Sequence, residues 1–239
     1  MVDVLGGITK AFELIATGDP TLYGIVSRTL FFSGIAVVLA MLWGTPIALL
    51  ISIRNFRGKS IIKAFFNSLI GVPTVVLGLV LFLIFSKSGP LGFLGLLYTP
   101  AAIILGEAVL VTPILISIMS NAIEAVDPEI MNLAKTLGAS ESQAAIAVLK
   151  EALNGVLLSN IASFNRAIAE LGVALLVGGN IAGLTDVLTT AISRYTARGE
   201  LDVAIALGIL LMVIVFGINV MLIIARKAKI LFVLWRNPQ

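Results

Sequence analysis

The stretch 29-TLFFSGIAVVLAMLWGTPIALLISI-53 runs for 25 residues without a charged side chain. A helix needs about 20 predominantly apolar residues to cross the hydrocarbon core of a bilayer. The stretch is therefore long enough to span a membrane as one helix. A transmembrane β-strand needs only about 9–11 residues, so a single apolar run of this length argues against a barrel strand.

The composition of the whole chain agrees with this interpretation. Of the 239 residues, 59% are hydrophobic and 12% are charged, whereas an ordinary soluble domain has about 25% charged residues. The sequence therefore predicts an all-α membrane protein with about five transmembrane helices. We expect the spans at 28–53, 62–86, 100–123, 156–178 and 202–225. No internal repeat is visible, so we predict a single transmembrane domain over 1–239.

The chain contains neither cysteine nor histidine. Disulfide and thiolate chemistry is therefore excluded, and the commonest transition-metal ligand and the usual neutral-pH proton carrier are missing. We predict no catalytic residue, no metal site and no cofactor bound by this chain. The net charge of +3 is small and lies in the connections, so it does not indicate nucleic-acid binding. The N-terminal residues do not have the pattern of a signal peptide.

Lysine and arginine are unevenly divided among the connections, and this division predicts the orientation. The connection after the first span is basic, with Arg54, Arg57, Lys59 and Lys63. The tail after the last span is also basic, with Arg226, Lys227, Lys229 and Arg236. The connection between the second and third spans holds only Lys87, and 179–201 holds Arg194 and Arg198. Because basic connections face the cytoplasm, we expect a multi-pass cell-membrane protein with its N-terminus outside and its C-terminus in the cytoplasm.

Two outer segments are expected to be helical. Apolar residues with a helical spacing precede the first span: Ile8, Phe12 and Ile15. They favour an interfacial helix over 8–20, with a frayed polar lead-in as the open alternative. A turn is expected at Gly178, Gly179 and Asn180. A second outer helix is then expected over 185–199, beginning at Thr185 and Asp186.

The long connection 124–155 is expected to lie in the cytoplasm as two short helices. Asp127 is placed to cap a helix that begins at Pro128. Gly138 suits the left-handed position that ends this helix, and Ser140 with Gln143 forms a capping box for a second helix to about 153. One face of the first helix is apolar, with Ile130, Leu133, Ala134 and Leu137. This face packs either against the chain's own membrane helices or against another protein.

Charged residues also occur inside the expected spans. Glu107 lies in the third span, and Arg166 and Glu170 lie four residues apart in the fourth, where they can pair. A charge at the bilayer centre costs roughly 2.5–3.5 kcal/mol on insertion scales, so such residues face protein or water. Ser159 and Ser163 continue the same stripe. Two interpretations stay open: a structural clamp between spans, or a translocation pathway in which Arg166 offers its guanidinium donors to a dianion.

The connection 124–155 resembles the coupling loop of ABC importer permeases. The pattern of that loop is Glu-Ala-Ala, three residues, a glycine, nine further residues and then Ile-x-Leu-Pro. Alignment on Gly138 places the triplet on Asn132, Leu133 and Ala134, with Leu137 next to the glycine. The match is partial, because Asn132 and Leu133 replace the first two residues and Lys150-Glu151 stand where Leu-Pro is usual. The resemblance implies that these residues couple the chain to an ATPase.

Two later segments closely resemble the permease subunits of tungstate- and molybdate-type oxyanion importers. They are 164-FNRAIAELGVALLVGGNI-181 and 185-TDVLTTAISRYTARGELDVAIALGILL-211. The family has Phe-Gly-Arg-x-Ile-x-Glu-x-Gly, Gly-Gly-Asn-Ile and Leu-Thr-Thr-Ala-Ile in this order and at this spacing. Here Asn165 replaces a glycine, and Asp186 stands where a basic residue is expected.

This resemblance implies a permease of the type I ABC importer fold. Two copies of the chain would lie beside two cytoplasmic ATPases that use ATP and Mg, and an extracytoplasmic binding protein would deliver the solute. The absence of G-x-x-x-x-G-K-[ST] agrees with a nucleotide site on another chain. The implied solute is tungstate or molybdate, with sulfate, phosphate or another anion as the alternative. A channel or secondary transporter is disfavoured by the lack of a repeat, and an intramembrane enzyme by the lack of any reactive group except carboxylates.

Overall fold

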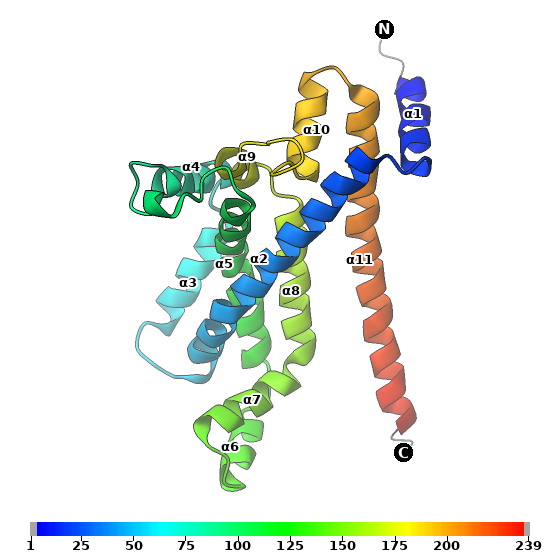
Figure 1. Ribbon diagram of the computed structural model, residues 1–239. Coiled ribbons are helices and arrows are strands. Elements are labelled where there is room, and N and C mark those ends of the chain that lie inside the picture. Colours follow the sequence, from blue (N-terminus) through cyan, green and yellow to red (C-terminus); the bar gives the residue numbers. More distant parts are fainter. Residues whose placement is uncertain (1–3, 237–239) are drawn as a thin grey trace. The chain divides into compact units, whose positions relative to one another are not determined.

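The computed structural model describes residues 4–236, with the side chains of residues 6, 8, 9 and 11–221. All regular elements of this part of the chain are helical, which confirms the all-α prediction. The basic residues of the tail, Arg226, Lys227, Lys229 and Arg236, lie outside the residues whose side chains are described. The elements (Figure 1) are α1 (Val4–Ala16), α2 (Pro20–Ile53), α3 (Lys59–Ile70), α4 (Thr74–Phe85), the 3-10 turn η1 (Gly92–Leu94), α5 (Pro100–Glu124), α6 (Pro128–Thr136), α7 (Glu141–Glu151), α8 (Leu153–Ile168), α9 (Gly172–Gly178), α10 (Leu188–Ala197) and α11 (Leu201–Arg236).

Three of the described helices are long and apolar enough to cross a membrane. They are α2, α5 and the part of α11 over Leu201–Met221. The number reaches five when each of two bent helix pairs is taken as one span, in rough agreement with the five spans expected. These pairs are α3 with α4, bent by 97°, and α7 with α8, bent by 72°. The second pair includes α7, which the sequence places in the connection 124–155 and not in the expected span 156–178.

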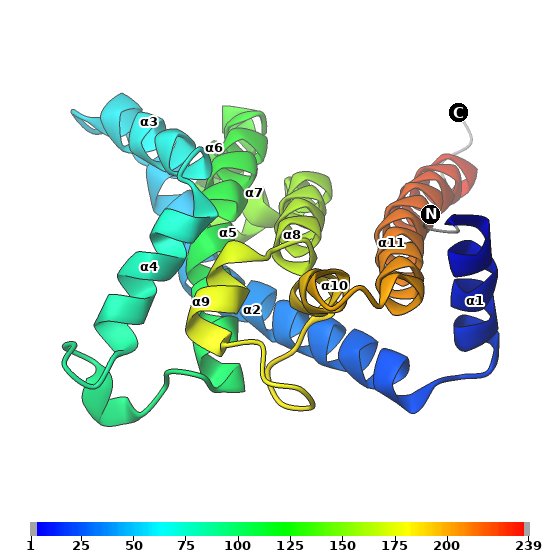
Figure 2. The ribbon, with the colours of Figure 1, turned by 90° about the horizontal axis from the view of Figure 1, so that it is seen from above.

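The expected span 62–86 is not one helix. α3 ends at Ile70, α4 begins at Thr74, and Pro73 between them has an extended backbone with φ −60° and ψ 127°. Proline lacks the backbone N–H that a continuing helix needs, and it disfavours helical backbone in the residue before it. The apolar run therefore turns at this point, and α4 lies beside α9 (Figure 2).

The expected span 156–178 is also broken. α8 ends at Ile168 and α9 begins at Gly172. A Cβ atom on Gly172 would lie 2.8 Å from Thr74 Oγ1 and 2.9 Å from Val75 N. Because glycine has no Cβ, α9 can begin directly against the first turn of α4.

Packing divides the chain into two compact units within the single domain that the sequence predicts. The first unit comprises the residues up to Val26 and those from Ala191 onward, and the second is Ser27–Thr190. In the first unit α1 packs against α11, and Tyr23 donates a hydrogen bond of 3.1 Å from Oη to Ile15 O. The first helix covers Val4–Ala16, whereas the sequence predicts 8–20.

The second unit is built around α5. This helix buries residues along most of its length, including Glu107, and it packs against α3, α4, α8 and α9. One hydrophobic cluster joins it to α2 and to the α6–α7 hairpin, and a second joins it to α4 and α9. In Figure 1 the hairpin lies at one end of this unit, and α4 and α9 lie at the other.

Candidate functional site

Arg166 and Glu170 form an ion pair in the second unit. Arg166 Nη1 lies 2.7 Å from Glu170 Oε2, and the two side chains are 33% and 1% exposed. The sequence predicts both residues on one helical face, but only Arg166 is helical. Glu170 lies in the break between α8 and α9, where its Oε1 accepts a hydrogen bond of 2.9 Å from Val173 N. The carboxylate therefore satisfies a backbone donor in the first turn of α9 as well as the guanidinium.

The other residues of the expected pathway are buried near this pair or on the same helix. Ser159 and Ser163 of α8 are 0% exposed, and Glu107 of α5 is 1% exposed. Ser159 Oγ donates to Val156 O of its own helix at 2.8 Å, which is a packing role. Ser163 Oγ has no hydrogen-bond partner among the described residues.

Glu107 adds a second carboxyl group to this region. The Ser33 hydroxyl of α2 and the Glu170 carboxylate both lie near it. Within the described part of the chain, Glu107 Oε2 and Ser33 Oγ are buried without a hydrogen-bond partner. Because a buried polar group without a partner is costly, these atoms mark the polar centre of the unit. In the sequence Ser33 is one hydroxyl in a long apolar run, and no local signal distinguishes it.

A second buried ion pair joins Arg28 to Asp186. Arg28 Nη2 lies 2.6 Å from Asp186 Oδ1, and the side chains are 23% and 1% exposed. Asp186 Oδ1 also accepts a hydrogen bond of 3.0 Å from Gly183 N. In the sequence Asp186 is only a departure from the family pattern, and nothing there indicates its partner. The pair joins α2 at Arg28 to the loop that precedes α10.

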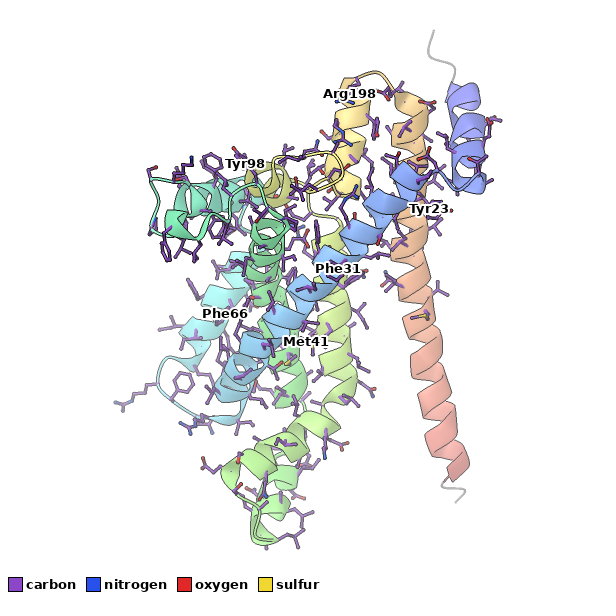
Figure 3. The ribbon with its side chains drawn as sticks, viewed as in Figure 1. Tyr23, Phe31, Met41, Phe66, Tyr98 and Arg198 are labelled. Atoms are coloured by element: carbon purple, nitrogen blue, oxygen red, sulfur yellow. The ribbon has the colours of Figure 1, made fainter. Side chains whose placement is uncertain are left out.

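The turn expected at Gly178, Gly179 and Asn180 is confirmed. Gly179 and Asn180 have left-handed backbones with φ 70° and 50°. A Cβ atom on Gly179 would lie 2.6 Å from Tyr98 Cδ1, so this residue has no room for a side chain. Tyr98, labelled in Figure 3, donates its backbone N–H to Val177 O at 2.8 Å.

The helix expected to follow this turn begins later than the sequence suggests. α10 starts at Leu188, not at Thr185, because Thr185 is used inside the loop. Its hydroxyl accepts from Ile181 N at 2.9 Å and donates to Gly178 O at 2.6 Å. The first residue of α10 donates instead to Thr29 Oγ1, from Leu188 N at 2.8 Å. The cap therefore comes from α2, and no local sequence signal could reveal it.

The hairpin between α5 and α8 has the caps that the sequence predicts. Asp127 Oδ1 accepts from Glu129 N at 2.9 Å, and Pro128 is the first residue of α6. Both bonds of the capping box between Ser140 and Gln143 are present at the start of α7. α7 ends at Glu151, before the expected limit of 153, and α8 follows after Ala152.

The turn at Gly138 is a Schellman motif. Ala139 N donates to Ala134 O at 3.0 Å, and Gly138 N donates to Lys135 O at 3.0 Å. Gly138 itself has φ 87°, as expected for a residue in the left-handed position.

The apolar face of α6 is divided between two directions. Ile130 packs on the hydrophobic cluster of its own unit. Leu133 and Leu137 are 62% and 80% exposed, and Asn132 and Gly138 are exposed while Ala134 is half-buried. The contact of Ile130 supports packing of this face against the chain's own helices. Coverage of Leu133 and Leu137 by another protein stays a prediction.

Membrane-spanning helices, a buried charged centre and an uncovered helical hairpin fit a transport component of the membrane. Residues 27–229 match the family described as binding-protein-dependent transport system inner membrane component, and the chain belongs to this family. The chain is thus a multi-pass inner-membrane permease subunit of the ABC importer type, a kind of subunit that works with an ATPase and a substrate-binding protein.

Three relatives are similar to this chain over most of its length. It is 38% identical over 213 residues to the tungstate uptake system permease protein TupB of Peptoclostridium acidaminophilum, over 89% of this chain and 93% of that protein. It is 37% identical over 217 residues to the protein of the same name from Campylobacter jejuni, over 90% of each chain. A probable anion ABC transporter permease protein of Haloferax volcanii is 38% identical over 214 residues, which cover 86% of this chain and 92% of that protein.

Proposed function

We propose that this chain is the permease subunit of a tungstate importer. The observation that carries the proposal is its 38% and 37% identity, over about nine-tenths of its length, to two tungstate uptake system permeases. Molybdate is the closest chemical alternative, because it is a tetrahedral dianion of nearly the same shape. Sulfate and phosphate are smaller tetrahedral anions and the next alternatives.

In this proposal Arg166 is the group that the solute contacts. Its guanidinium carries a permanent charge and a fixed fork of donors, which suits an oxyanion. The side chain is 33% exposed, while the carboxylate that it binds is buried. Ser159, Ser163 and Glu107 are the other candidates for the pathway. A pathway must release its solute, so we expect a weak site here.

The coupling surface is the second part of the proposal. We define it as Asn132, Leu133, Ala134, Leu137 and Gly138, around the turn that ends α6. Leu133 and Leu137 would enter a groove on a cytoplasmic ATPase, which binds ATP and Mg, and closure of the ATPase dimer would move the hairpin. Two copies of the chain would assemble with two ATPases, and an extracytoplasmic binding protein would deliver the anion at the opposite face.

The proposed orientation puts the N-terminus outside and the C-terminus in the cytoplasm. The basic connection between α2 and α3 supports it, because Arg54 and Arg57 are exposed there and basic connections favour the cytoplasmic side. The hairpin and this connection would then share that side.

Tungsten accumulation in cells tests the proposed solute. A host without its own tungstate uptake would express the chain with its ATPase and its binding protein, and cell-associated tungsten would be measured by mass spectrometry. Uptake that depends on this chain, and that excess sulfate and phosphate do not suppress, is the expected result. Strong suppression by excess sulfate or phosphate would contradict the assignment. Suppression of more than about half of the tungsten uptake by an equal concentration of molybdate would reassign the solute to molybdate.

A further inference from the structure

The Glu170 carboxylate occupies one of the guanidinium donors that we assign to the solute. Its Oε2 is 2.7 Å from Arg166 Nη1, and its Oε1 accepts from Val173 N at 2.9 Å. The Glu170 side chain is 1% exposed and the Arg166 side chain is 33% exposed. The negative group is thus held inside the protein, while the positive group reaches an accessible surface.

A carboxylate and a tetrahedral oxyanion bind a guanidinium through the same charge-assisted hydrogen bonds. They therefore compete for the donors of Arg166. Glu170 is attached four residues away, so its local concentration at Arg166 far exceeds that of any free solute. A solute that binds weakly cannot displace it while the backbone stays in this conformation.

The break around Glu170 is a short non-helical segment that side-chain hydrogen bonds hold in place. Residues 169–171 separate α8 from α9 and lie outside both helices. Glu170 is tied to three places at once: Arg166 in α8, Val173 in α9, and Thr189, whose Oγ1 donates to Glu170 O at 2.5 Å. A rotation of α9 at this break would carry the carboxylate with the Val173 N–H and away from Arg166, since short non-helical segments absorb such changes.

We propose that Glu170 is an internal competing anion that occupies Arg166 whenever the break between α8 and α9 is closed. Opening of the break frees the guanidinium for the solute oxyanion, and closing returns the carboxylate and expels the solute. Glu170 thus allows the site to release its solute. The position of the carboxylate, and not its affinity for the guanidinium, determines when Arg166 can bind the solute. The inference rests on the proposed oxyanion transport but not on which oxyanion is carried.

Replacement of Glu170 by glutamine tests this proposal. The E170Q variant keeps the side-chain shape and an oxygen that can accept from Val173 N, but it removes the competing charge. Tungstate binding would be measured by equilibrium dialysis on the purified permease–ATPase complex without the binding protein. We expect the affinity of E170Q for tungstate to rise at least about tenfold over that of the natural chain, with slower uptake because release is impaired. The double variant R166Q/E170Q should lose this gain.

The second buried pair provides a matched control. Asp186 is 1% exposed, lies 2.6 Å from Arg28 and accepts a backbone N–H from Gly183, so Asp186→Asn breaks a pair of the same kind elsewhere in the unit. We expect no change in tungstate affinity for D186N. An equal gain in D186N, or no gain in E170Q, overturns the proposal. If E170Q does not accumulate, T189V removes the hydroxyl that holds the Glu170 backbone and should give a smaller gain, and an unchanged affinity there would also overturn it.

Different results would reject the proposed solute and the proposed role of Glu170. Dialysis would be repeated with molybdate, sulfate and phosphate as probes. Failure of the natural chain to import tungstate rejects the proposed solute, whereas a gain in affinity of E170Q for any of these anions still supports the competing carboxylate. Tungstate import without a gain for any probe rejects the competing carboxylate alone.

Discussion

The hairpin turn at Gly138 and the break before Gly172 are both places where one helix stops and the next begins, but they are held in opposite ways. The capping hydrogen bonds at the hairpin join residues a few positions apart, from the Asp127 cap to the Ser140–Gln143 box. Those at the break include one from Thr189, nineteen residues beyond Glu170. The hairpin exposes its leucines, whereas the break buries its carboxylate.

This difference separates two mechanical roles. A turn held by local bonds keeps its shape when its surroundings move, so the hairpin can transmit a push from another chain without deforming. A break held by a buried pair and by distant contacts changes when those contacts change, so it can respond to that push. In the proposed mechanism the hairpin therefore acts as a rigid surface and the break as a movable joint.

The largest effect is expected from backbone strain at the hairpin turn. Gly138 has φ 87°, and a Cβ atom there would meet nothing within 4 Å, so valine adds backbone strain without a steric clash. The left-handed conformation costs roughly 1–2 kcal/mol for a residue with a Cβ. We expect Gly138→Val to abolish uptake while membrane insertion is unchanged, as measured by tungsten accumulation and by the amount of chain in isolated membranes.

Two matched variants accompany this one. Gly138→Asn should retain uptake, because asparagine tolerates the left-handed region. Gly58→Val puts the same strain at another open glycine, with φ 97°, and should leave uptake in place. Full uptake and ATPase stimulation by Gly138→Val would rule out docking at this turn.

A smaller effect is expected from the exposed leucines of the coupling surface. The double change Leu133→Ser and Leu137→Ser removes apolar groups that are 62% and 80% exposed, so the stability of the chain should not fall. We expect recovery of the ATPase with the purified permease to drop about tenfold, as for the loss of central interface contacts. Ile146→Ser on α7, where the side chain is 50% exposed, should change recovery little, and equal losses for both variants would argue against a specific surface.

A substitution at Gly172 tests how tightly α9 packs against α4 at the break. A Cβ atom there would lie within 3 Å of Thr74 Oγ1 and Val75 N, so α9 must shift away from α4. We expect Gly172→Ala to lower the free energy of unfolding by about 1–3 kcal/mol, as overpacking usually does. Gly208→Ala in α11 is the control, because nothing lies within 4 Å of its added Cβ. Thermal unfolding in detergent would compare the two, and equal midpoints would show that the approach of α9 to α4 is not tight.

The smallest effect concerns the cap of α7. Ser140→Ala removes the hydroxyl that accepts from Gln143 N at 3.3 Å, which should cost about 1 kcal/mol. Ser142→Ala next to it should cost less, since Ser142 does not cap the helix. The difference in thermal midpoint between the two variants measures the cap, and a reversed order would contradict the assignment of Ser140.

The two regions also differ in how far the sequence can predict them. The caps of the hairpin are predictable to within two residues, because Asp127, Gly138 and Ser140 act on neighbours in the chain. The breaks at Pro73 and Gly172 are not predicted as ends of helices, because an uninterrupted apolar run of this length reads as one span. The spacing of four between Arg166 and Glu170 predicts their pairing correctly. Arg28 and Asp186 are 158 residues apart, and only the folded chain brings them together.

The most direct test of coupled tungstate import is accumulation of tungstate in proteoliposomes that hold the purified permease with its ATPase, with the binding protein supplied on the outer face and ATP inside. We predict accumulation that requires ATP, the binding protein and an intact turn at Gly138. Tungstate entry that proceeds equally without ATP, or that persists in Gly138→Val, would contradict this mechanism.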